Sequence, residues 1–179
     1  MAAEELSSYK CKIQLIETMP TIGRKFLMAG KSGLNITTSN DKFLTDFGDA
    51  REWISPIIQN FGPIQIIKLC ESLGQEMFIG SSGRVFPKVM KASPLLRAWL
   101  KKLKRSGVEI QTSTRWLDFD DNPIQSLKND QLVHRIRTKE KVILTKSRVV
   151  IFALGGASWT KLGSDGKWAA VLKRYLRNP

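Results

Sequence analysis

The most regular hydrophobic pattern in this chain predicts a helix from Ser93 to Gly107. Apolar residues recur there every three or four positions, as on one face of a helix. Ser93 is a preferred N-cap residue, Pro94 fits the first helical position, and Gly107 is a natural stop. The apolar stripe consists of Leu95, Leu96, Trp99, Leu100 and Leu103.

Weaker helical patterns predict further helices at residues 1–10, within residues 41–78 and from Ser164 to Tyr175. Pro63 is placed to begin one of the helices in the second region. The glycine-punctuated stretches at residues 18–40 and 79–92 predict loops. In the long 41–78 region the helix-forming apolar residues are Phe43, Leu44, Phe47, Trp53, Ile54, Ile57, Ile58, Ile64, Ile67 and Leu69.

Alternating apolar and polar positions predict several short strands. They lie at residues 12–16, 108–112, 115–119, 132–138 and 141–145. Residues 120–123, Asp-Asp-Asn-Pro, predict a turn. Residues 149–154 differ because they are apolar on both faces, which predicts a buried parallel strand that runs into Gly155 and Gly156.

Composition excludes several classes of protein. A hydrophobic fraction of 42% is typical of a globular protein and too high for a disordered basic tail. The run at residues 149–154 is too short to cross a bilayer, which needs about 20 residues. The N-terminus has two acids and no apolar stretch of the kind found in secretory signals, so cytoplasm with reduced thiols is the expected compartment.

The histidine and cysteine content argues against metal and triad chemistry. His134 is the single histidine, and Cys11 and Cys70 are far apart in the sequence. No zinc ligand spacing is present, so no metal site is expected. A Ser-His-Asp triad would have to use His134, whose alternating surroundings predict instead an exposed histidine on a strand.

Positive charge is concentrated in the second half of the chain. The formal net charge is +13, of which residues 1–90 contribute +1 and residues 91–179 contribute +12. This asymmetry raises the alternative of a basic nucleic-acid-binding module. Four cations nevertheless lie at the end of the predicted 93–107 helix, where they complement its dipole, and no nucleic-acid-binding signature is visible. These cations are Lys101, Lys102, Lys104 and Arg105.

An acidic residue after a short strand is the first hint of a nucleotide site. Glu17 follows the predicted strand at 12–16, and in dinucleotide-binding folds such a carboxylate accepts hydrogen bonds from the ribose hydroxyls. The loop that follows contains the cations Arg24 and Lys25, which suit a pyrophosphate. It also contains glycines that permit close backbone approach, namely Gly23, Gly30 and Gly33.

Three longer segments resemble one family of flavoproteins. They are residues 18–35, TMPTIGRKFLMAGKSGLN, residues 80–100, GSSGRVFPKVMKASPLLRAWL, and residues 153–166, ALGGASWTKLGSDG. They are similar to the NAD(P)/FAD-dependent oxidoreductases of the BaiN-like and aminoacetone-oxidase-like group. The resemblance covers essentially the whole chain, whereas family members are about twice as long.

The resemblance implies an α/β fold, a partial two-dinucleotide-binding, Rossmann-like FAD domain with a helical excursion and a small antiparallel β ribbon. One incomplete FAD-binding domain would span residues 1–179. Its expected parts are a remnant of the first βαβ unit with the cofactor loop at 1–40, a helical excursion at 41–107, a ribbon at 108–148, and a buried strand, Gly-Gly turn and helix at 149–179.

The resemblance also implies the residues that contact FAD. Glu17 would bind the ribose, and Trp116 would lie beside the adenine. The pyrophosphate and flavin would be lined by Arg24, Lys25, Gly30, Gly33 and Asn35, and Gly155 and Gly156 would end the strand that closes over the cofactor. Because flavin chemistry belongs largely to the cofactor, no residue is assigned as catalytic.

The chain departs from the family pattern at both ends. The first strand, the G-x-G-x-x-G fingerprint and the C-terminal half have no counterpart in it. We therefore expect a fragment of an FAD-dependent, NAD(P)H-linked oxidoreductase, truncated at both ends, with impaired or no independent activity. A complementary polypeptide would supply the missing parts, and the substrate is not indicated.

Overall fold

The computed structural model describes residues 1–120, 123, 126, 130–163 and 165–176, with only the backbone described at residue 176. The chain forms two compact units. Unit 1 consists of Met1–Arg24 and Leu103–Pro179, and unit 2 consists of Lys25–Lys102. Each unit is described below by itself. The predicted turn at 120–123 includes residues outside the described part of the chain.

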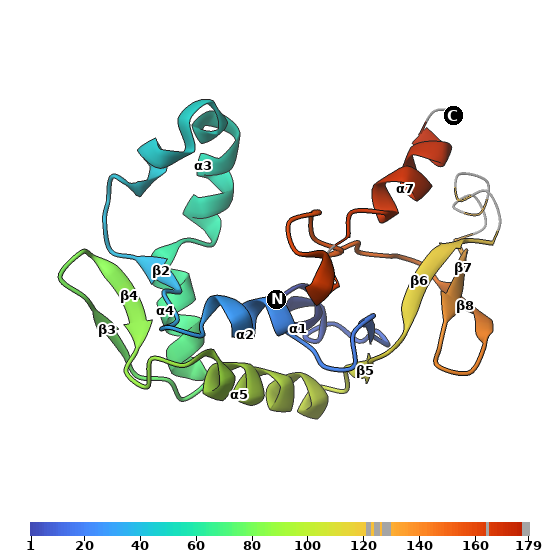
Figure 1. Cartoon of the computed structure of the whole chain (residues 1–179), viewed down its shortest axis with the longest axis horizontal. Coiled ribbons are helices and arrows are strands. Elements are labelled where there is room, and N and C mark those ends of the chain that lie inside the picture. The colour runs from blue at the N-terminus through green and yellow to red at the C-terminus, as the bar shows by residue number, and fades with distance from the viewer. Residues whose placement is uncertain (121–122, 124–125, 127–129, 164, 177–179) are drawn as a thin grey trace. The chain divides into compact units, whose positions relative to one another are not determined.

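Unit 1 contains a pair of parallel strands. β1 (Gln14–Ile16) and β5 (Glu109–Gln111) lie side by side, with Leu15 opposite Ile110 (Figure 1). Both strands confirm the alternation-based prediction, although each is shorter than the predicted range. The parallel direction places the carboxyl ends of the two strands at the same edge of the sheet.

The rest of unit 1 is built around an antiparallel ribbon. β6 (Arg115–Phe119), β7 (Leu132–Arg137) and β8 (Val142–Ser147) pair in that order, which confirms the predicted ribbon. Ile136 and Phe119 are buried between the strands. His134 is buried too, so the prediction of an exposed histidine is wrong: its ring packs 5.2 Å from that of Phe119.

Short helices complete unit 1. They are α1 (Ala2–Leu6), the 3-10 helix η2 (Thr160–Leu162) and α7 (Trp168–Leu176). The first is shorter than the predicted 1–10 helix, and the last begins after the predicted Ser164. The end of α7 is fastened to β6, because the Tyr175 hydroxyl donates to Asp118 Oδ1 (2.7 Å) and Arg174 donates to Asp118 Oδ2 (2.6 Å).

The predicted buried strand at residues 149–154 is wrong. These residues form no strand, and the side chains of Val149 and Ile151 are 75% and 54% exposed. Phe152 packs within unit 1, with its ring 4.8 Å from the ring of Trp116. A segment that is apolar on both faces is buried only when both faces are covered, and here the face with Val149 and Ile151 is exposed.

Unit 2 contains a small antiparallel sheet that the sequence did not reveal. Its strands are β2 (Thr37–Thr38), β4 (Arg84–Pro87) and β3 (Met77–Ile79), in that order. The predicted loop at 79–92 is wrong in part, because it holds β4, while its Gly-Ser-Ser-Gly segment forms the turn of the β3–β4 hairpin. The predicted loop at 18–40 is wrong in part, because it holds β2 and the short helix α2 (Arg24–Ala29).

Helices form the rest of unit 2. The 3-10 helix η1 (Phe43–Ala50), α3 (Arg51–Asn60) and α4 (Pro63–Ser72) confirm the predicted helical region, including the start at Pro63. α5 (Ala92–Arg105) confirms the predicted 93–107 helix, and Gly107 follows its end with φ +78°.

The core of unit 2 lies between α4, α5 and the residues before β2. It consists of Leu34, Cys70, Leu73, Ala92 and Leu95. Burial raises the pKa of the Cys70 thiol, with a further contribution from the charge of Glu71. Within the described residues, no helix is long and apolar enough to cross a membrane.

Candidate functional site in unit 1

The candidate site lies at the carboxyl ends of β1 and β5. In parallel sheets with Rossmann-like topology, ligands bind outside these strand ends. Glu17 directly follows β1, and Thr112 directly follows β5. Two hydrogen bonds join the following turns, because the Thr114 N–H donates to the Glu17 carbonyl and the Ser113 N–H donates to the Met19 carbonyl, each at 3.0 Å. These backbone bonds hold the turn that carries Glu17 next to the turn that carries the hydroxyl residues.

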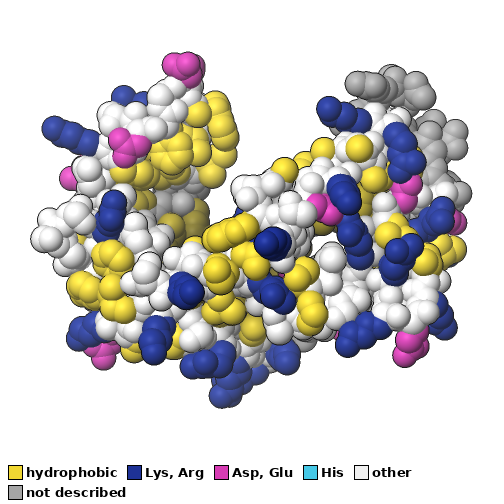
Figure 2. All heavy atoms as spheres, viewed as in Figure 1, with side chains coloured by type: hydrophobic (Ala, Val, Ile, Leu, Met, Phe, Trp, Pro, Cys, Tyr) yellow, Lys and Arg dark blue, Asp and Glu magenta, His cyan; other side chains and the backbone are white. Residues whose placement is uncertain are grey.

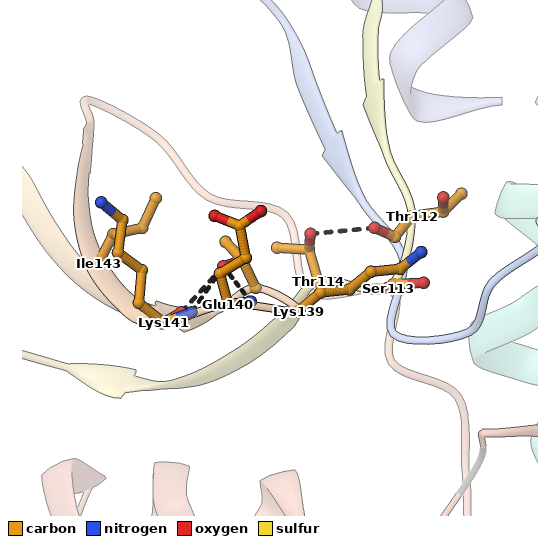
Figure 3. Close-up of a pocket in the computed structure, with 8 residues that line it drawn as sticks. Thr112, Ser113, Thr114, Lys139, Glu140, Lys141 and Ile143 are labelled. Atoms are coloured by element: carbon orange, nitrogen blue, oxygen red, sulfur yellow. Dashed lines mark hydrogen bonds between the residues drawn. The ribbon is translucent and has the colours of Figure 1, made fainter.

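A pocket of about 350 Å³ opens beside this turn (Figure 3). One wall is the turn after β5, and the other is the turn between β7 and β8. In the close-up the Lys139 side chain extends from the second turn toward the first. The lining residues are Thr112, Ser113, Thr114, Thr138, Lys139, Glu140, Lys141 and Ile143.

The second wall of this pocket is fixed by a threonine. The Thr138 hydroxyl donates to the Lys141 carbonyl at 3.0 Å and lies 3.1 Å from the Lys141 N–H, for which it is the acceptor. This bonding closes the hairpin turn and holds the backbone of Lys139 and Lys141 in place. The pocket therefore offers hydroxyls, two ammonium groups and the Glu140 carboxylate, and the hydroxyls and ammonium groups suit a sugar or a phosphate.

The Glu17 carboxylate is half-buried and partly engaged. Its Oε1 accepts a hydrogen bond from the Met19 N–H at 2.8 Å, which fixes the turn after β1. Its second oxygen carries no hydrogen bond within the described part of the chain. Because one oxygen orients the group, the other can accept a hydrogen bond from a ligand hydroxyl.

Three further predicted site residues of unit 1 do not line the pocket. Trp116 is on β6, where its ring packs 5.5 Å from that of Phe119 and its buried Nε1 has no partner among the described residues. Gly155 has φ +69°, and its carbonyl accepts a hydrogen bond from Trp168 Nε1 (2.9 Å). Gly156 is exposed, and a Cβ there would meet open space. Their roles toward a cofactor stay predictions.

The predicted cations are on α2. Arg24, half-buried, begins this helix in unit 1, and Lys25 follows it in unit 2. The structure thus places them on a short helix rather than in the open loop that the sequence suggested.

The predicted residues Gly30, Gly33 and Asn35 belong to unit 2. A Cβ at Gly30 would meet the Cβ of Ala92 at 2.6 Å, so close packing alone requires glycine there. Gly33 has φ +138°, a conformation that favours glycine. Asn35 is exposed and lines a second pocket, which is described below.

Sequence reasoning missed the residues that build the unit 1 pocket. Thr112 and Lys141 lie at ends of predicted strands, Ser113 and Lys139 lie between predicted strands, and none of the four was predicted as a site residue. A usable signal was the Lys-Glu-Lys turn between two alternating segments, combined with the rule that the ends of parallel strands meet. The Arg115–Asp165 ion pair (2.9 Å) was missed as well. The Lys167 N–H and the Arg115 guanidinium lower the pKa of the Asp165 carboxyl.

The residues present fit part of a dinucleotide. The Glu17 carboxylate follows β1 and does not line the pocket, whereas threonine hydroxyls and lysine ammonium groups do. Groups of these kinds match ribose hydroxyls and phosphates. Within the described ranges, no group of three or more His, Cys, Asp or Glu side chains is placed to hold a metal ion.

Comparison with known proteins identifies a family. Residues 1–177 match the family described as "HI0933-like protein Rossmann domain". Over 163 residues the chain is 26% identical to a 3-dehydro-bile acid delta(4,6)-reductase of Clostridium scindens. This alignment covers 90% of the chain and 37% of the reductase, so the chain spans little more than a third of the length of that relative.

Solved structures show the same fold. THI4 of Thermovibrio ammonificans has a TM-score of 0.57 at 12% identity, with 99% of this chain and 58% of that chain covered. BexE, studied for oxidation during BE-7585A biosynthesis, has a TM-score of 0.50 at 13% identity, with 90% and 30% covered. The predicted Rossmann-like α/β fold is thereby confirmed.

Proposed function

Because the chain belongs to the HI0933-like Rossmann domain family, we propose that it is part of the FAD-binding domain of an NAD(P)H-linked oxidoreductase. The observation that carries this proposal is the position of Glu17. It follows a parallel strand and lies in a turn that is hydrogen-bonded to the hydroxyl-bearing turn after the neighbouring strand. This is the place where Rossmann-like folds bind the ribose of a dinucleotide.

In this proposal unit 1 binds the adenosine side of FAD. The free oxygen of Glu17 accepts a hydrogen bond from a ribose hydroxyl, and Lys139 neutralises phosphate charge from the pocket wall. A volume of about 350 Å³ accommodates an adenosine-sized group. When bound, FAD supplies the electron transfer, and the residues of this chain hold and orient it.

The predicted contacts in unit 2 are proposed from the family resemblance alone. Lys25, Gly30, Gly33 and Asn35 would approach the pyrophosphate and the flavin, as the family resemblance implies. Gly33 supports this role best, because its positive φ turns the backbone sharply in the loop just before β2.

We further propose that the chain alone has impaired or no reductase activity and works with a second polypeptide. Two observations support this. The chain spans 37% of its reductase relative, and the apolar segment at 149–154 has an uncovered face. An added strand or helix would cover that face.

The proposal is tested by titrating the purified full chain with FAD and following quenching of flavin fluorescence. Replacing Glu17 with Ala removes the acceptor, and we expect FAD affinity to fall by about 1–3 kcal/mol, or roughly 5- to 150-fold. Glu109→Gln is the matched control, because Glu109 lies on β5 with an exposed side chain that pairs with Lys12 at 3.7 Å.

Two results would contradict this proposal. One is a chain that quenches no flavin fluorescence at any FAD concentration. The other is equal loss of affinity in the Glu17 and Glu109 variants, which would indicate a general charge effect rather than a ribose contact.

A further inference from the structure

Unit 2 contains a pocket of its own, with a volume of about 380 Å³. It lies between η1, the facing sides of α3 and α4, and β2. Its lining residues are Asn35, Thr37, Thr38, Phe43, Asp46, Phe47, Ile58, Phe61, Gly62, Pro63 and Ile66. Its volume lies within the range of small-molecule sites, about 300–1,000 Å³.

Aromatic and branched side chains form most of the pocket wall. The rings of Phe43 and Phe47 meet edge to face, with centroids 6.4 Å apart. Ile58 projects from α3, and Ile66 on α4 also packs against the core of unit 2. Hydrophobic side chains gather over α3 in the space-filling view (Figure 2). A wall of this kind favours a flat, apolar ligand.

One end of the pocket is polar. Asn35 and Thr37 are two residues apart, and both line the pocket. Within the described residues, neither side chain makes a hydrogen bond, whereas the neighbouring Thr38 hydroxyl lies 3.3 Å from the Gly83 carbonyl, to which it donates. The Asn35 amide and the Thr37 hydroxyl are thus available to a ligand that offers a carbonyl or a hydroxyl group.

The charge of the lining excludes anionic ligands. All eleven lining residues are described, and among them Asp46 is charged while none is Lys, Arg or His. A phosphate or carboxylate group would meet repulsion from Asp46 and no compensating cation. A ligand hydroxyl can instead donate to that carboxylate.

From these observations we propose that the unit 2 pocket binds a neutral, flat, mostly apolar small molecule that presents one carbonyl or hydroxyl group to the Asn35 amide and the Thr37 hydroxyl. The proposal that such a molecule binds rests on the unit 2 pocket alone. That the ligand is the substrate of the flavin rests on the proposed function, because Asn35 ends the loop proposed to approach the flavin.

The test uses the full chain without flavin and 2-naphthol as the probe, with binding measured by isothermal titration calorimetry. Naphthalene-2-sulfonate is the anionic counterpart of the same ring size. We expect 2-naphthol to bind and the sulfonate to bind at least tenfold more weakly. Absence of 2-naphthol binding, or equal affinity for the two probes, overturns the proposal.

Two adjacent isoleucines of α3 provide a matched pair of variants. Ile58 lines the pocket, whereas Ile57 is 58% exposed and does not. Ile58→Trp fills the cavity, and we expect it to lower 2-naphthol affinity at least tenfold. Ile57→Trp adds the same bulk outside the pocket and should leave the affinity unchanged. Equal effects of the two changes would contradict this site.

A gentler variant keeps the test decisive if Ile58→Trp does not fold. Thr37→Val keeps the shape and removes the hydroxyl, so 2-naphthol should lose affinity about three- to tenfold while naphthalene should not. Equal loss for both probes would contradict the proposed polar contact. Because no flavin is present, failure here leaves FAD binding at Glu17 untouched, and failure of the FAD titration leaves this pocket untouched.

Discussion

The two pockets of this chain have similar volumes and different chemistry. The pocket of unit 1 lies beside the turn after β5, and its wall includes two lysines, four hydroxyl side chains and the Glu140 carboxylate. The pocket of unit 2 lies between helices, and its wall is largely aromatic and aliphatic with one carboxylate. Strand ends expose backbone and polar turns to a ligand, whereas facing helices expose apolar stripes. The contrast predicts a charged, sugar-bearing ligand for unit 1 and a neutral apolar one for unit 2.

The cores of the two units also differ in composition. The core of unit 2 is aliphatic and helical, with Leu95 and Cys70 each 1% exposed. The core of unit 1 is an aromatic cluster on the ribbon, where Phe119 contacts Trp116, Phe152 and Tyr175 through edge-to-face rings. Substitutions in one core therefore report on one unit, provided that the two units unfold separately.

The largest effect is expected from Leu95→Ala in unit 2 and Ile136→Ala in unit 1. Both side chains are 1% exposed, and their truncation leaves a cavity that costs about 2–5 kcal/mol. Hydrogen exchange measured by mass spectrometry should show faster exchange mainly in the unit that carries the change. If each variant accelerates exchange equally in both units, the chain is one cooperative body and the comparison of units fails.

A smaller effect is expected from Gly30→Ala. The added methyl group would meet Ala92 at 2.6 Å, and overpacking of this kind costs about 1–3 kcal/mol. Gly156→Ala is the control, because a Cβ there meets open space. Urea unfolding should separate the two variants. If the two variants are equally stable, packing does not require glycine at position 30. A contact with the cofactor would then be the remaining proposed reason for glycine there.

In Tyr175→Phe the free energy of unfolding is expected to fall by about 1 kcal/mol, because the change removes the hydroxyl that donates to Asp118. Burial, followed by the hydrogen bond to Asp118, raises the pKa of Tyr175 to about 12 from 10.0. Because the folded chain holds this proton more tightly, the associated stability is complete below pH 10 and is lost as pH rises toward 12. The phenolate absorbance of the native chain should show a midpoint near 12 that the variant lacks. A native chain without that midpoint would argue against the fastening of α7 to β6.

The smallest effect concerns His134. Burial lowers its pKa from 6.5, so the folded chain keeps a neutral ring where the unfolded chain takes up a proton. Stability from this group is therefore present above pH 6.5 and declines as pH falls below it. The single imidazole signal in proton NMR should titrate below pH 6.5. A midpoint at or above 6.5 would mean that the ribbon of unit 1 is open to water.

The elements that depend mainly on a local sequence pattern were predicted correctly. The α5 helix was evident from its stripe and Gly107, and the ribbon from alternation. The β3–β4 hairpin was missed because Gly80, Ser81, Ser82 and Gly83 read as an open loop, although they form a tight turn. The buried strand at 149–154 was wrong because burial depends on neighbours, which a sequence pattern does not supply.

The candidate site was predictable only in part, for the same reason. Glu17 was found because it directly follows a strand. Its neighbours Ser113 and Thr114 come from a distant part of the sequence and reach it through pairing of β1 with β5. Gly30 was chosen for a cofactor, while the structure shows that close packing against Ala92 already demands glycine.

The uncovered face of residues 149–154 has a consequence for how molecules of this chain behave toward one another. Val149 and Ile151 are exposed in extended chain outside any sheet, and such a segment can add to the edge of another molecule. The net charge of +13 opposes that encounter, because like-charged molecules repel at low ionic strength. Salt shortens the range of this repulsion to about 8 Å at 0.15 M. The positive net charge thus opposes self-association of the chain, and added salt should promote self-association rather than prevent it.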